Sequence, residues 1–158
     1  MRYAPARLTS PQSRSWLPVS SISPVTTDTV RDTEFLDLLS SYRDTGGLAQ
    51  GEELTARRKG DSFLQLARDI ANRRVIHFVW RDIIWLPLFQ FEPAGHAVRS
   101  DIQMLIGELS GALDDWEMAQ WFVEPNTCLH GELPITQTTV QFRQVHDAAR
   151  SLRYLRCN

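Results

Sequence analysis

Hydrophobic side chains recur at helical spacing in the first half of the chain, after a polar start. From Thr33 onward they fall every three or four residues, which predicts a helix that begins there and ends at a pair of glycines at 46 and 47. The positions that form this apolar stripe are Phe35, Leu38, Leu39 and Tyr42.

Two further short helices are predicted behind that glycine pair. The first opens at Gly51 and ends near Gly60, and Asp61 or Ser62 caps the second. Two short helices joined by a tight turn that contains glycine form a candidate helix-turn-helix. The second helix carries one apolar stripe, made of Phe63, Leu66, Ala67 and Ile70.

The period then changes to that of β-strands. Residues 75–80 and 83–86 are rich in β-branched and aromatic side chains and are separated by Arg81 and Asp82, which predicts a β-hairpin. A hairpin directly behind a helix-turn-helix is the element order of a winged helix. The alternative is a hairpin that covers a core.

The second half is predicted to be helical. Residues 102–113 keep a helical register, and Asp114 with Asp115 caps the next helix, which Pro125 ends. A loop rich in glycine and proline follows to Pro134, and the final helix carries Phe142, Val145, Ala149 and Leu152.

Taken together, the pattern predicts a mainly α protein with three parts. Residues 1–28 contain prolines at near-regular intervals and form a disordered leader. Residues 29–93 form the module with the helix-turn-helix and the hairpin, and residues 94–158 form a small helical domain. We expect a cytoplasmic protein, since no apolar run is long enough to cross a membrane and two cysteines make no disulfide framework.

Charge is distributed unevenly, although the net charge is only −2. Residues 55–81 are basic, whereas residues 101–132 hold seven acids and no lysine or arginine. Clustered cations either neutralise nucleic-acid phosphates or form an ordinary solvated surface. The candidate DNA-binding residues are Arg57, Arg58, Lys59, Arg68, Arg73 and Arg74.

The residues that an enzyme needs do not form a recognisable set, so we expect neither catalysis nor a bound metal or cofactor. Cys128 and His130, with His146, have no standard zinc spacing. A small hydrolase that uses the two histidines is a rival reading without a supporting motif.

One stretch resembles a known family. The pattern Trp116-Glu117-x-x-x-Trp121-Phe122-x-x-Pro125-Asn126-x-x-Leu129-x-Gly131-x-x-Pro134 is similar to the toxin-binding domain of the bacterial Xre/MbcA/ParS antitoxins, although His130 stands where the family often has a small residue. The segment Pro87-Leu88-Phe89-Gln90-Phe91 and the run from Ala148 to Arg153 extend the resemblance over about residues 48–156.

The resemblance implies an antitoxin of a type II toxin-antitoxin system. Its partner would be a RES-domain toxin that consumes NAD, and it would repress its own operon by binding operator DNA, as a homo-oligomer. The alternative is a stand-alone transcription regulator of the same fold without a toxin partner. The predicted toxin-binding residues are Trp116, Trp121, Phe122, Pro125, Asn126, Leu129, Gly131, Pro134, Arg150, Arg153 and Arg156.

Overall fold

The computed structural model describes residues 27–56, 61–93 and 97–157. Seven α-helices and a small sheet follow one another in these ranges, so the mainly α prediction is confirmed. Most of the predicted leader and three of the candidate DNA-binding residues, Arg57, Arg58 and Lys59, lie outside the described residues. No described helix is long and apolar enough to span a membrane.

The first half of the described chain contains helices and all three strands of the sheet. They are α1 (Thr27–Ser41), the 3₁₀ turn η1 (Arg43–Thr45), β1 (Leu48–Gln50), α2 (Gly51–Ala56), α3 (Asp61–Ala71), β2 (Phe78–Trp80), β3 (Ile83–Pro87) and η2 (Leu88–Gln90). Helix α1 begins before the expected start at Thr33, because its first turns are polar and give no periodic signal.

The second half contains helices and one further 3₁₀ turn. They are α4 (Ser100–Leu109), α5 (Asp115–Val123), η3 (Thr127–Leu129), α6 (Pro134–Gln137) and α7 (Phe142–Cys157). The predicted cap of α5 is confirmed as a capping box: the Asp114 carboxylate accepts from the Glu117 amide at 2.7 Å, and the Glu117 carboxylate accepts from the Asp114 amide at 3.0 Å.

The sheet has three antiparallel strands in the order β1-β3-β2. The hairpin β2–β3 is confirmed, whereas the sequence missed β1. The turn residues of the hairpin, Arg81 and Asp82, both have positive φ, 48° and 61°. This conformation gives a two-residue turn the twist of the strands that it joins. Arg81 is held there by its ion pair with Asp32 on α1 and by its guanidinium, which lies 4.7 Å from the centre of the Trp80 ring.

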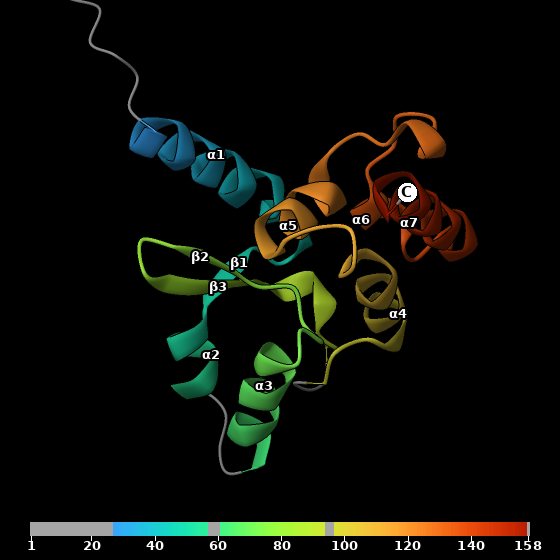
Figure 1. Cartoon of the computed structure of the whole chain (residues 1–158). Coiled ribbons are helices and arrows are strands. Elements are labelled where there is room, and N and C mark those ends of the chain that lie inside the picture. The colour runs from blue at the N-terminus through green and yellow to red at the C-terminus, as the bar shows by residue number, and fades with distance from the viewer. Residues whose placement is uncertain (1–26, 57–60, 94–96, 158) are drawn as a thin grey trace, which may run out of the picture.

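The sheet separates two hydrophobic clusters, because alternate residues of a strand point to opposite faces. One face packs against α2 and α3 through a small cluster of Leu54, Leu66, Val75 and Leu86. The other face contributes Phe78, Trp80 and Trp85 to the larger cluster. Figure 1 shows α2 and α3 on one side of the sheet, with α1 and α5 on the other.

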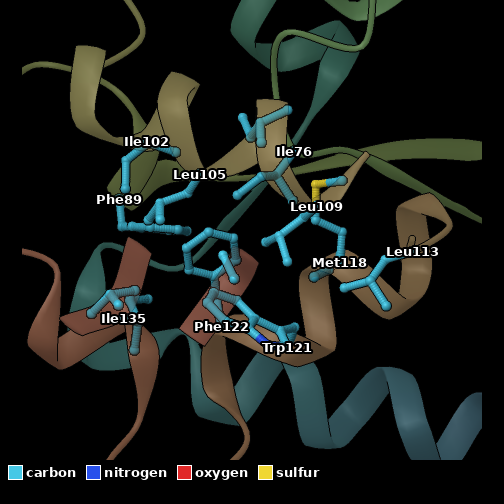
Figure 2. Packing of buried hydrophobic residues seen from close by; sticks show 14 of the residues in the cluster. Ile76, Phe89, Ile102, Leu105, Leu109, Leu113, Met118, Trp121, Phe122 and Ile135 are labelled. Atoms are coloured by element: carbon cyan, nitrogen blue, oxygen red, sulfur yellow. The ribbon is translucent and has the colours of Figure 1, made fainter. Parts of the chain in front are cut away.

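The larger cluster joins α1 to the C-terminal helices. The Phe35 ring stacks on Trp80, with centroids 3.9 Å apart, and the fully buried Tyr42 hydroxyl donates to the Ala119 carbonyl at 2.6 Å. Burial raises the pKa of Tyr42, so this hydroxyl keeps its proton. Residues from both sides of the predicted boundary at 93 therefore share one core, whose C-terminal part Figure 2 shows from close by.

Gln90 ties the end of the hairpin to the segment that precedes it. Its side chain is fully buried; the amide oxygen accepts from Ile76 N at 2.7 Å, and the amide nitrogen donates to Ile76 O at 2.9 Å and Pro87 O at 2.8 Å. These bonds hold residues 75–77 out of the strand, which is why β2 starts later than the expected position 75.

We predict that Gln90→Met lowers the free energy of unfolding by at least about 3 kcal/mol, since one amide and two carbonyls lose their partners in a buried site. Urea unfolding measures this loss. Gln103→Met, at an exposed position of α4, is the control and should change stability by less than about 0.5 kcal/mol. A change in the Gln90 variant no larger than in the control would contradict the assigned role.

Candidate functional site

The loop between α5 and α6 is closed by Asn126. Its side-chain oxygen accepts from the Cys128 amide at 2.9 Å, and its backbone carbonyl accepts from Leu129 N at 3.0 Å and Gly131 N at 2.9 Å. Its own amide donates to Glu132 O at 3.1 Å. One residue therefore organises the whole corner, and the resemblance motif places an asparagine there.

The corner needs two consecutive residues in the left-handed region. His130 has φ 57° and Gly131 has φ 88°. Glycine adopts this conformation without a side-chain penalty, which explains Gly131. His130 is strained but exposed, so its larger side chain finds room in solvent.

The remaining motif residues divide into buried and exposed sets. Trp121 is only 9% exposed, and Phe122, Leu129 and Pro134 are buried as well, so these side chains form core rather than a free surface (Figure 2 labels Trp121 and Phe122). Pro125 and Gly131 are exposed at the corner.

Trp116 lies where α5 meets the hairpin and α1. It is half-buried, its ring meets the Phe78 ring edge to face with centroids 5.0 Å apart, and the Arg31 guanidinium of α1 lies 5.6 Å from its centre. This predicted toxin-binding aromatic therefore packs α5 onto the sheet.

Two of the three predicted toxin-binding arginines on α7 are engaged within the chain. Arg153 pairs with Glu108 of α4 at 2.8 Å, and Arg156 pairs with Glu117 at the start of α5, also at 2.8 Å. The Arg156 hydrogen bond, aided by the Asp114 amide, lowers the pKa of Glu117. These two ion pairs join arginines of α7 to acids in residues 101–132 and hold this helix on α4 and α5.

The outer face of α7 carries a different set of side chains. Arg150 is exposed and makes no ion pair with a described residue. Tyr154 is 59% exposed and Leu155 is 81% exposed, one turn further on. The exposed Arg150 and Tyr154, one helical turn apart, are residue types that protein-binding surfaces favour.

The arginines in the described part of the basic stretch, residues 55–81, differ in their contacts. Arg68 and Arg74 are exposed and form no ion pair with a described residue. Arg73, with φ 52°, instead binds Asp115 through Nη2 at 2.7 Å and Nε at 3.1 Å, and also lies within reach of the Leu113 carbonyl. The Arg73 side chain thus holds the end of α3 against the N-terminus of α5.

The residues considered for metal binding or hydrolysis do not form a ligand set. Cys128 and His130 lie exposed in the corner, and His146 on α7 has its Nε2 3.5 Å from Glu108. Within residues 27–56, 61–93 and 97–157, no three histidine, cysteine or acidic side chains are grouped to hold a metal ion.

No family model, no curated protein and no solved structure matches the chain.

The Glu117–Arg156 contact predicts a pH dependence of stability. Because the folded-state pKa of Glu117 lies below its unfolded value, its contribution is present above the unfolded pKa and is lost as the pH falls through the folded pKa. We expect Arg156→Met to raise the Glu117 pKa and to lower the free energy of unfolding at pH 7 by about 0.5 kcal/mol, a difference that vanishes once Glu117 is protonated.

An NMR titration of the Glu117 carboxyl carbon and urea unfolding at several pH values measure both effects. Arg143→Met removes an exposed arginine from the same helix and should leave the Glu117 titration unchanged. An unshifted Glu117 titration in the Arg156 variant would show that the pair does not control this carboxyl.

Proposed function

We propose that the chain is an antitoxin that binds and neutralises an NAD-consuming RES-domain toxin through its C-terminal helices. The observation that carries the proposal is the outer face of α7, where Arg150 and Tyr154 are exposed one helical turn apart and Leu155 is exposed next to Tyr154 in the sequence. Arginine and tyrosine are the residue types that protein interfaces favour, and both are exposed on this helix beside the 81% exposed Leu155 in the sequence.

The corner between α5 and α6 gives independent support. Three positions of the resemblance motif have a physical task here: Asn126 closes the loop, Gly131 takes the left-handed conformation, and Trp121 anchors the corner in the core. The motif spacing is thus what this corner requires, as expected if the similarity to the antitoxin family extends to its fold.

The three arginines of α7 then have separate tasks. Arg153 and Arg156 hold the helix on α4 and α5, while Arg150 faces outward and is available to an anionic group. A cleft that binds the pyrophosphate of NAD offers a toxin surface complementary to such a guanidinium.

The DNA-binding half of the proposal rests on element order and charge. Helices α2 and α3 are followed directly by the hairpin β2–β3, the order of a winged helix, and β1 pairs with β3 beside them. Arg68 and Arg74 supply exposed cations on and behind α3. We propose that this surface contacts operator phosphates and that Arg73 supports it by holding α3 on α5.

For neutralisation, we predict that the double variant Arg150→Ala, Leu155→Asp stays folded but binds the toxin at least tenfold more weakly, since both side chains lie in water in the free chain. Cellular NAD and growth during co-expression with a RES-domain toxin measure neutralisation, and co-purification measures the complex. Trp121→Ala should instead lose about 3–5 kcal/mol of folding stability.

Met104→Asp on α4 is the matched control, because Met104 is 54% exposed and lies outside the proposed surface. Unimpaired binding by the α7 variant would exclude this face as the toxin surface. If the intact chain neither binds such a toxin nor preserves NAD, the antitoxin proposal fails; promoter binding that persists in that case would favour the stand-alone regulator.

For DNA, we predict that Arg68→Ala and Arg74→Ala each weaken binding to the chain's own promoter and together reduce the slope of log affinity against log salt by about 2. Fluorescence anisotropy at several salt concentrations gives both quantities. Arg143→Ala on α7 should leave the slope unchanged. A slope unaffected by the pair would place the phosphate contacts elsewhere.

A further inference from the structure

The outer face of α7 carries a regular stripe of charged and aromatic side chains. Arg143, Asp147, Arg150 and Tyr154 follow one another at intervals of four, three and four residues, so they lie along one line of the helix. All four side chains are exposed. The line runs opposite the buried face of α7, which includes Val145.

The charged members of this stripe have no partner of opposite charge in the described part of the chain. Asp147 stands between Arg143 and Arg150 on the helix, yet none of the ion pairs among the described residues includes any of the three. Two other arginines of α7 are bound to acids of α4 and α5. The stripe is therefore the part of α7 whose charges the fold leaves unpaired.

The order of the charges makes the stripe complementary to a second copy of itself that runs in the opposite direction. With a twofold axis between positions 148 and 149, Asp147 of one copy faces Arg150 of the other, and Arg150 of the first faces Asp147 of the second. A parallel pair of helices would instead bring each charge against an identical charge. The charge pattern therefore selects the antiparallel arrangement.

The same register also matches the two ends of the stripe. Arg143 lies four residues before Asp147, and Tyr154 lies four residues after Arg150, so Arg143 of one copy faces Tyr154 of the other. A guanidinium packs favourably on the face of a tyrosine ring, and this ring is 59% exposed. All four positions of the stripe thus find a suitable partner in one arrangement.

We propose that the outer face of α7 binds a second copy of the chain as an antiparallel pair of α7 helices. One pair of helices buries less than the roughly 1,200 Å² of a stable interface, so the association is weak and reversible. Its exposed ion pairs are screened by salt, so the dimer dissociates more readily as the ionic strength rises.

The inference rests on α7 alone and does not require a toxin. Arg150 and Tyr154 also belong to the face assigned above to the toxin, so the second copy and the toxin would compete for it. The chain would then bind a toxin through α7 only as a monomer. The following tests contain no toxin, and their failure leaves the proposed function untouched.

Sedimentation equilibrium of the full-length chain, over a range of protein concentrations and with a reducing agent because Cys128 is exposed, tests the pairing. We expect a monomer–dimer equilibrium that salt weakens. Asp147→Arg should weaken it at least tenfold, because both central pairs become repulsive. Asp37→Arg, at an exposed position of α1, changes the net charge equally and should leave the equilibrium unchanged.

A chain that stays monomeric at every concentration overturns the proposal. So does an Asp147→Arg variant that dimerises as well as the Asp37→Arg control, since the charge of the stripe would then play no part.

A mixture of two variants tests the charge pairing without reference to the folding of either one. Arg150→Asp should weaken self-association as Asp147→Arg does, because it too places like charges together. In an equimolar mixture of the two variants, every new charge faces its opposite in the other chain. We expect the mixture to dimerise at least tenfold more tightly than either variant alone. A mixture no tighter than its components overturns the proposed pairing of positions 147 and 150.

Discussion

Strand β3 has to be covered on both of its faces, and this requirement organises the rest of the molecule. Ile83, Trp85 and Pro87 point to one face and Ile84 and Leu86 to the other, and the strand lies between β1 and β2. A strand with apolar residues on both sides needs two cores. Helices α2 and α3 supply the smaller one, while α1 crosses to the opposite face and joins the C-terminal helices.

Ion pairs orient the helices α3 and α7 on the apolar clusters. The basic and acidic blocks of the sequence meet within the fold: Arg73 reaches Asp115, Arg153 reaches Glu108, and Arg156 reaches Glu117. Each pair is partly exposed and contributes little by itself, but together they orient α3 and α7 on the same helical core. The outer face of α7 carries Arg150, which forms no ion pair with a described residue.

The sequence predicted the features that depend on neighbouring residues, such as caps and turns. Features that depend on tertiary contacts could not be predicted from it. The α5 capping box, the hairpin and the final helix follow from short-range signals. Strand β1 did not, because Leu48–Gln50 is too short to show alternation and is defined only by its pairing with β3. Likewise, the motif located the corner around Asn126, but whether Arg150 or Arg153 faces outward depends on where α4 places Glu108.

The central functional claim is that the outer face of α7 and the corner beside it meet the toxin. Hydrogen–deuterium exchange of the chain, alone and in complex with the RES-domain toxin, tests this most directly. We expect new protection at the corner, residues 125–131, and in the last two turns of α7, with α2 and α3 unchanged. Protection confined to α2, α3 and the hairpin, or no protection at all, would contradict it.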